Sequence, residues 1–157
     1  MAFAIRGGAP LARHGTGGGR RCLPCADNHG GSASIMRIVE HLDFSKPDEV
    51  RTFPNGRAEI LNTSGGVVAR LVLQPGWRWS RDVKPIAGTE WCEAPHFQYH
   101  VSGTLHAKMA DGTEFEVGPG AISSMPAGHD GWVVGDEPAV LVDFFGSTDY
   151  ARGTGTG

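Results

Sequence analysis

From residue 57 to residue 146 the chain alternates short apolar stretches with clusters of turn residues. Within these stretches apolar and β-branched residues recur at every second position, which is the pattern of strands with one buried face. The predicted strands are Ala58–Thr63, Val67–Leu73, Trp77–Trp79, His96–Val101, Thr104–Met109, Thr113–Val117, Ala121–Met125, Trp132–Val134 and Ala139–Phe145. With about eight to ten short strands and no convincing long helix, the pattern predicts an all-β sandwich or barrel.

Glycine and proline residues mark the turns between these strands. Phe53–Gly56 and Asp111–Gly112 have the composition of turns, and Ser64–Gly66 separates two predicted strands. Ser102-Gly103 is predicted to close a tight hairpin. Ahead of the first strand, Ser45–Arg51 is predicted to make one helical turn, with Ser45 as N-cap and Pro47 in the first turn.

The first 35 residues differ in composition from the rest. They hold eight of the 24 glycines and four arginines against one aspartate, with few large apolar residues. Such a segment buries too little apolar surface to offset its chain entropy. We therefore expect a disordered Gly/Arg-rich leader over residues 1–35, one folded domain over 36–150 and a disordered tail over 151–157. Met36 is a candidate natural start, which would make the leader an upstream extension.

The chain of 157 residues has three cysteines, and an odd number argues against a disulfide framework. This predicts a cytoplasmic protein with reduced thiols. Two of the cysteines, Cys22 and Cys25, lie in the leader together with His29. They supply at most three of the four ligands that a structural zinc needs, and the alternative is that they are incidental.

Composition also excludes several classes of function. The net charge is −3 and no dense Lys/Arg face is visible, so we expect no nucleic-acid partner. No apolar run approaches the roughly 20 residues of a membrane helix, and the first ten residues lack the apolar core of a secretory signal. The spacing shows no nucleophile–base–carboxylate set, and Gly15–Gly19 follows no strand, as a phosphate-binding loop would.

Residues 120–131 resemble the second of two short motifs of the cupins. That motif runs Gly, five residues, Pro, one residue, Gly, and then a histidine after two more residues. The chain matches it at Gly120, Pro126 and Gly128, but His129 follows directly and Gly131 stands at the usual histidine position. The metal ligand that this histidine provides in cupins is therefore expected to be displaced to His129 or lost.

The first cupin motif, His-x-His followed by Glu and then Gly, is similar in spacing to residues 90–103. Counting back from Gly103 places His96 at the glutamate position, and Glu90 and Cys92 at the two histidine positions. The segment thus resembles the motif with its ligand types exchanged.

Residues 76–146 are also similar to small single-domain bacterial cupins, generally of unassigned activity. The resemblance implies a double-stranded β-helix, the jelly-roll barrel. It also implies a divalent transition metal (Fe, Mn, Zn, Ni or Cu) and a small-molecule ligand inside the barrel. Cupin barrels commonly pair through N-terminal strands, so a homodimer that exchanges residues 36–60 is expected.

Strand geometry narrows the candidate metal ligands. Side chains alternate along a strand, so His96, Gln98 and His100 share one face, which the resemblance directs into the barrel. Four residues of strand separate His96 from His100 by roughly 13 Å, too far for one ion unless the strand bends. The predicted metal set is therefore Cys92, His96 and His129, with Glu90 as a possible fourth ligand.

The ligand space is predicted to adjoin this set. Gln98 and His100 are expected as polar groups of the pocket, and Trp79 and Met109 as apolar walls. Several of the candidate residues have a structural alternative. Cys92 could be a small buried hydrophobe, and Trp79 could be core packing. Among the histidines, His96 and His100 could be interior residues with satisfied hydrogen bonds, and His129 could cap backbone groups.

Two main functions remain open from the sequence, and a third, weaker interpretation is a purely structural barrel. The first is a cupin that binds a metal ion and a small organic molecule and acts on it as an oxygenase or isomerase. Three ligands with an open position suit such a catalytic metal. The second is a non-catalytic small-molecule sensor or binding module without metal, which the departures at Glu90, Cys92 and Gly131 favour.

Overall fold

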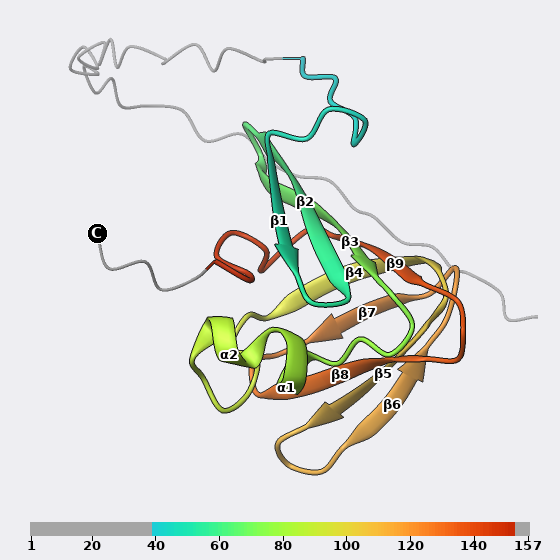
Figure 1. Cartoon of the computed structure of the whole chain (residues 1–157). Coiled ribbons are helices and arrows are strands. Elements are labelled where there is room, and N and C mark those ends of the chain that lie inside the picture. Colours follow the sequence, from blue (N-terminus) through green and yellow to red (C-terminus); the bar gives the residue numbers. More distant parts are fainter. Residues whose placement is uncertain (1–38, 153–157) are drawn as a thin grey trace, which may run out of the picture. The chain divides into compact units, whose positions relative to one another are not determined.

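The structure, a computed structural model, describes residues 39–152, which form nine strands and two short helices (Figure 1). The strands are β1 Glu49–Phe53, β2 Gly56–Thr63, β3 Gly66–Leu73, β4 His96–Ser102, β5 Thr104–Met109, β6 Glu114–Val117, β7 Ile122–Met125, β8 His129–Val134 and β9 Ala139–Asp143. The helices are α1 Trp79–Asp82 and α2 Lys84–Ala87. The predictions for the leader, including Cys22 and Cys25, and for residues 153–157 lie outside the described residues.

The strands form two antiparallel sheets. Six strands pair in the order β1-β2-β3-β9-β4-β7, and three pair in the order β6-β5-β8. Strands far apart in sequence lie side by side, as β3 and β9 do, which is the topology of a jelly roll. The predicted all-β fold with a single jelly-roll barrel is confirmed.

One hydrophobic core draws its side chains from both sheets. Leu71 and Leu141 come from the large sheet and Leu105 and Val133 from the small one, all with little or no exposure. Strand β4 shows how the sequence pattern produces this. Its odd-numbered residues from Phe97 to Val101 are 41–48% exposed, whereas His96, Gln98 and His100 are buried, as the alternation predicted.

The prediction of a hairpin at Ser102-Gly103 is wrong, because the strands on either side do not pair. β4 pairs with β7 and β9, whereas β5 pairs with β6 and β8, so the chain bends here from one sheet to the other. Gly103 has φ +66, and a Cβ on it would lie 2.4 Å from the Pro138 carbonyl oxygen. The glycine thus permits a sheet-switching corner, which uses the same residue types as a hairpin turn.

The predicted helical turn at Ser45–Arg51 is also wrong. Ser45 lies in a turn held by Asp43, and residues from Glu49 onward form strand β1. The Arg51 guanidinium is buried and donates to the carbonyl oxygens of Ser147, Thr148 and Tyr150. Pairing with β2 and these charge-assisted bonds outweigh the local helix signals.

The segment between β3 and β4 forms α1 and α2 instead of continuing as a strand through Trp79. Carboxylates accept from backbone N–H groups at the start of α1: Asp82 from Arg78 at 2.9 Å and Asp130 from Ser80 at 2.9 Å. These contacts fix the first helical turn, as N-caps do. Among residues 39–152, neither helix has the length or apolar character required to cross a membrane.

Candidate metal and ligand site

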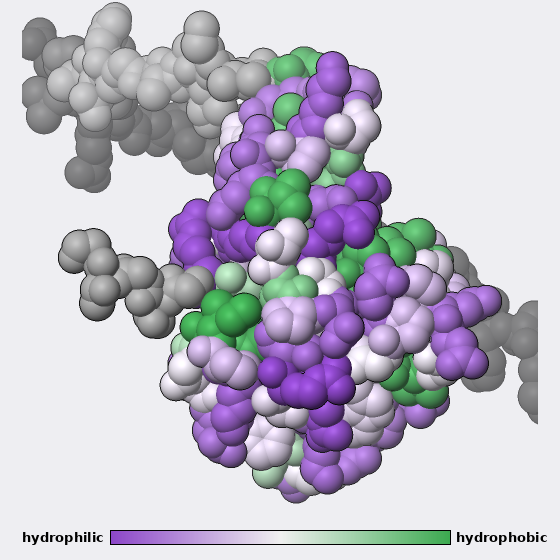
Figure 2. Space-filling view, in the orientation of Figure 1, coloured by the Kyte–Doolittle hydropathy of each residue, from purple (hydrophilic) through white to green (hydrophobic). Residues whose placement is uncertain are grey.

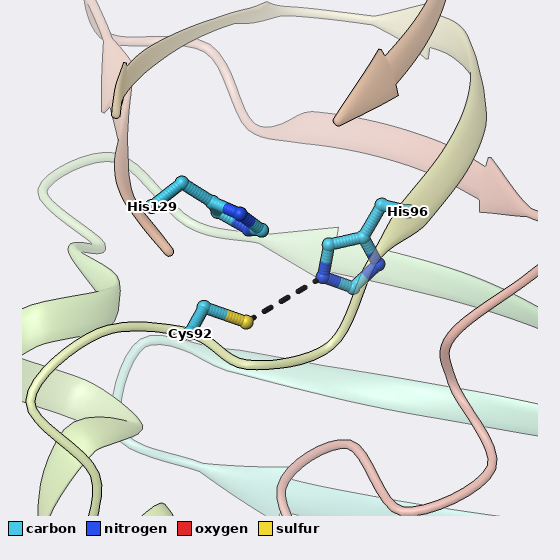
Figure 3. Close-up of side chains that lie close together, drawn as sticks. All are labelled: Cys92, His96 and His129. Atoms are coloured by element: carbon cyan, nitrogen blue, oxygen red, sulfur yellow. Dashed lines mark hydrogen bonds between the residues drawn. The ribbon is translucent and has the colours of Figure 1, made fainter. Parts of the chain in front are cut away.

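Three predicted ligands, Cys92, His96 and His129, converge inside the barrel (Figure 3). Their sulfur and ring nitrogen atoms all lie within 4.8 Å of one another, and all three side chains are buried. His96 opens β4 and His129 opens β8. Cys92 lies in the segment before β4, where its N–H donates to the His129 carbonyl oxygen and its carbonyl accepts from Gly128. Backbone pairing therefore brings the thiol beside His129.

The two imidazoles are oriented by bonds at their outer nitrogens. His96 Nδ1 donates to the Asp143 carboxylate at 2.6 Å, which turns its Nε2 toward Cys92 Sγ, 3.7 Å away. His129 Nδ1 donates to the Pro126 carbonyl oxygen at 2.8 Å. Both histidines thus keep Nε2 for a metal and use Nδ1 for a supporting partner, which is the usual arrangement of metal-binding histidines.

Asp143 is the functional residue that the sequence reasoning missed. Its carboxylate is fully buried and accepts from His96, the Ser147 hydroxyl and the backbone N–H groups of Phe97 and Phe145. The signal was present, because Asp143 continues the inward register of Ala139 and Leu141 on β9. A carboxylate on the core face of a strand needs partners, and here they are the site. Cys92, His96 and Asp143 thus form a chain that sequence spacing alone does not reveal.

The charges of Cys92 and His96 support each other. Burial raises the pKa of the Cys92 thiol, but the hydrogen bonds and charge of His129 and His96 outweigh it and bring the pKa from 9.0 to about 6. Burial lowers the pKa of His96, but bonds to Asp143 and Cys92 and their negative charge raise it from 6.5 to about 9. At neutral pH the metal-free pair is a thiolate beside an imidazolium.

Tyr150, near the C-terminal end of the described residues, packs against the metal-ligand group. Its ring centroid lies 5.6 Å from that of His96, in an edge-to-face arrangement. Burial and the negative charges of Cys92 and Asp143 raise the pKa of its phenol well above 10. Tyr150 therefore stays a neutral phenol beside the thiolate.

Glu90, predicted as a possible fourth ligand, does not join the other three. Its side chain is 78% exposed and pairs with Lys84 at 2.7 Å. The reason is local: Glu90 precedes the backbone bridge that draws Cys92 inward, and it points to solvent beside α2.

The four predicted pocket residues divide into two pairs. Trp79 and Gln98 line a cavity beside the histidines. His100 is buried but bonds the Ser123 hydroxyl at 2.8 Å, and burial lowers its pKa, so it is an interior histidine with a satisfied bond. Met109 is half-buried at the end of β5. Neither His100 nor Met109 lines the cavities described below.

Two cavities flank the metal-ligand group. The inner one, about 30 Å³, is lined by His96 and His129 and otherwise mostly by apolar side chains. The outer one is an open groove of about 430 Å³, to which Cys92 contributes. Trp79 and Tyr150 are walls of both. The three ligands therefore lie between a small inner cavity and a larger outer groove.

The exchange of a motif histidine for Gly131 has a structural counterpart. Gly131 lines the inner cavity, and a Cβ placed on it would lie 4.0 Å from the Trp77 ring. Its neighbour Asp130 is buried and bonds Arg78, Ser80 and the Gly131 N–H. The indole thus lies against the position from which a histidine at 131 would extend.

Comparison with known proteins relates the chain to others by fold. No protein-family model matches the chain, and no curated protein matches it in sequence. A protein of unknown function from Rhizobium leguminosarum bv. viciae aligns at a TM-score of 0.51 and 18% identity, over 68% of this chain and 94% of that one. A cupin-like protein from Thermotoga maritima aligns at 0.44 and 18%, over 62% of this chain and 72% of that one.

Oxalate decarboxylase from Lactobacillus farciminis aligns at a TM-score of 0.48 and 20% identity, over 65% of this chain. The chain spans about a third of that enzyme, 32% of its length. At such identities the likeness concerns the fold alone. The two-sheet jelly-roll topology and the motif at residues 120–129 give the described domain a cupin fold.

Proposed function

We propose that this cupin-fold protein binds a divalent transition metal through Cys92 Sγ, His96 Nε2 and His129 Nε2, and uses it on a small organic molecule. The observation that carries the proposal is the convergence of one donor atom from each residue within 4.8 Å, with Nδ1 of each imidazole bonded to a supporting group. A buried thiolate and two correctly turned imidazoles are a donor set for a metal, and a core of apolar residues has no need of them.

The three donor atoms favour some of the candidate metals over others. One thiolate and two imidazoles suit zinc and copper, and nickel after them, whereas iron and manganese are served better by carboxylates. Glu90, the carboxylate that would have favoured those two, lies at the surface. Zinc is therefore the first candidate among the five metals that the cupin resemblance implies.

Three protein ligands leave a position open, as in catalytic rather than structural sites. A metal held there supplies a Lewis acid that polarises a bound oxygen atom. The residues of the chain supply the rest: Asp143 holds the orientation of His96, and the buried Trp79 and Tyr150 are walls of the cavity beside the histidines. The oxygenase or isomerase chemistry expected from the cupin resemblance belongs to this proposal.

Cobalt(II) titration of chelator-treated protein tests the site, because cobalt bound by a thiolate shows a charge-transfer absorption. The Cys22→Ser/Cys25→Ser protein is the background, so that Cys92 is the one thiol present. One equivalent of cobalt is expected to produce the thiolate band. Cys92→Ser is expected to remove the band, and His129→Gln to weaken binding at least tenfold.

His106→Gln is the matched control. The His106 side chain bonds Glu114 and Glu116 of β6 and is not one of the proposed ligands, so its substitution is expected to leave cobalt binding unchanged. A cobalt spectrum without the thiolate band, or equal loss in all three histidine and cysteine variants, would contradict the proposed ligand set.

The second candidate function, a binding module without metal, is favoured by one observation. Cys92, His96 and Asp143 already satisfy one another by hydrogen bonds and opposite charge, so the site is chemically complete without an ion. Thermal-shift measurements on chelator-treated protein distinguish the candidates. Stabilisation by organic metabolites alone supports the binding module, whereas stabilisation only after metal is added supports the metal site.

A further inference from the structure

Two buried polar atoms beside the metal-ligand group have no hydrogen-bond partner among residues 39–152. They are Trp77 Nε1 and Gln98 Oε1, on side chains that are 4% and 2% exposed. A buried polar atom without a partner destabilises the fold, so native proteins contain few of them. Both residues line the inner cavity together with His96 and His129. One unpartnered donor and one unpartnered acceptor thus belong to residues that line the same cavity.

We infer that the inner cavity binds the neutral polar end of a small organic molecule. That end accepts a hydrogen bond from the Trp77 indole N–H and donates one to Gln98 Oε1. The inference rests on the proposed function for its role, because it makes this end the part of the substrate that anchors next to the metal. Binding itself requires only the cavity and the two atoms.

Charge selects a neutral end over an ionised one. Among the described residues that line the inner cavity none is a lysine or arginine, and the Asp130 carboxylate is one of the walls. Arg78, the partner of Asp130, is half-exposed and points away toward Trp132. Asp130 is already paired with Arg78, and His96 with Asp143 and Cys92, so an ionised end group would find no unpaired opposite charge in the cavity.

Size limits the end group to very few atoms. The inner cavity measures about 30 Å³, and a single water molecule needs roughly 10–15 Å³ on a comparable measure. A hydroxyl or carboxamide group fits this space, whereas a ring does not. The outer groove, which shares Trp79 and Tyr150 as walls, has the volume for the remainder of the molecule.

The backbones of both residues are held by hydrogen bonds and strand pairing. The Trp77 backbone N–H donates to the Gln74 carbonyl oxygen, and the Trp77 carbonyl oxygen accepts from the Val133 N–H. Gln98 lies in the middle of β4, in register with Asp143 of β9 and Ser123 of β7. Buried side chains on such firmly held backbone favour a preformed polar subsite.

The indole N–H signal of Trp77 reports binding directly in ¹⁵N-labelled full-length protein. The chain has four tryptophans, so the signal is assigned as the one that Trp77→Phe removes. Chelator-treated protein is titrated with formamide, methanol, formate and methylammonium at constant ionic strength. Formamide and methanol are expected to shift this signal saturably, with dissociation constants on the order of 1–100 mM as befits two or three heavy atoms. Formate and methylammonium are expected to leave it in place.

Gln98→Met is the decisive variant and Gln74→Met its control, because Gln74 is exposed and Gln98 is buried. Gln98→Met is expected to weaken formamide binding at least tenfold. It is also expected to keep or raise Tm by a few degrees, since an unpaired amide is replaced by an apolar chain of similar shape. Gln74→Met is expected to change neither.

Three results would overturn the inference: no response to any probe, which indicates bound water only; equal responses to formamide and formate; or unchanged binding in Gln98→Met. The metal site fails separately. The Gln98→Met protein is expected to bind cobalt as the wild type does. If the wild-type protein binds formamide but not cobalt, the proposed metal site is wrong and the polar subsite stands.

Discussion

At the scale of single residues the site depends on a charge pair inside the barrel. Cys92 Sγ and His96 Nε2 are 3.7 Å apart, and each favours the ionised form of the other. In chelator-treated Cys22→Ser/Cys25→Ser protein the far-ultraviolet absorbance of the thiolate is expected to titrate with a midpoint near pH 6. His96→Gln is expected to move the midpoint upward, because burial raises the pKa of Cys92 and the variant lacks the His96 charge that lowers it. A midpoint near 9 in the parent protein would show that the pair does not form.

The same two shifts fix how the stability of the metal-free protein depends on pH. The folded pKa of Cys92 lies below its ordinary 9.0, so its contribution is lost as pH falls through about 6. The folded pKa of His96 lies above its ordinary 6.5, so its contribution is lost as pH rises through about 9. Urea unfolding with chelator present is expected to give maximal stability between these values. Cys92→Ala is expected to weaken the dependence of the free energy of unfolding on pH. The same pH dependence in that variant and in the parent would contradict the Cys92–His96 charge pair.

Substitution of Asp143 tests whether its carboxylate orients the His96 imidazole for metal binding. Asp143→Asn keeps the shape but can present its amide N–H to His96 Nδ1, which favours the tautomer with the proton on Nε2. Cobalt affinity is expected to fall about 10–100-fold, as for other supporting groups of metal ligands. The pH at which cobalt binds half-maximally is also expected to change. A loss of stability with cobalt affinity unchanged would assign Asp143 to packing alone.

At the scale of secondary-structure elements the sequence predicted the strands well and their connections less well. Alternation on β4 correctly separated His96, Gln98 and His100 from their exposed neighbours. Ser102-Gly103 misled because the residue types of a turn do not say whether the flanking strands pair with each other. Ser45–Arg51 misled because the partners of Arg51 are about 100 residues later in the chain. Only tertiary contacts decide such points.

The candidate site shows the same division between local and long-range information. Cys92, His96 and His129 could be chosen from motif spacing and strand geometry. Asp143 and Trp77 could not be assigned roles, because their part depends on which strands become neighbours. Glu90 was placed in the wrong surroundings, since spacing within a motif does not show which loop residues turn inward.

The corner between β4 and β5 can be tested with two glycines. A Cβ at Gly103 would lie 2.4–2.8 Å from backbone atoms of Pro138 and Ala139, and φ there is +66. Gly103→Ala is expected to destabilise the fold by about 3 kcal/mol or more, measured by urea unfolding. Gly112→Ala, at φ +90 with open space around it, carries the backbone strain alone and is expected to cost about 1 kcal/mol. Equal losses in both would show that the corner is not tightly packed.

At the scale of the whole molecule the outer side of the large sheet stands out. On the face shown in Figure 2, hydrophobic residues lie in small separate groups among hydrophilic ones. On β4 and β7, by contrast, Tyr99 and Ile122 are direct neighbours in register, 41% and 64% exposed, and Phe97 packs near Phe144. Such a patch is uncommon on monomers, and we expect a second copy to cover it in the predicted homodimer.

Light scattering on two variants tests the dimer and its surface. Ile122→Lys is expected to give monomers with unchanged Tm, because Ile122 is largely exposed and lies on the uncharged patch. Val50→Lys, on β1 within the segment 36–60, is half-exposed on the same sheet and tests the exchange predicted from the sequence. A monomeric parent protein would remove the homodimer, and dissociation by Val50→Lys alone would move the interface to β1.

Anomalous diffraction would observe the proposed metal ion directly. Crystals of the full chain grown with zinc are expected to show one strong anomalous peak inside the barrel, about 2.3 Å from Cys92 Sγ and about 2.0–2.1 Å from Nε2 of His96 and His129. Zinc bound only by surface groups, with Cys92 still bonded to His96 as in Figure 3, would contradict the proposed metal site.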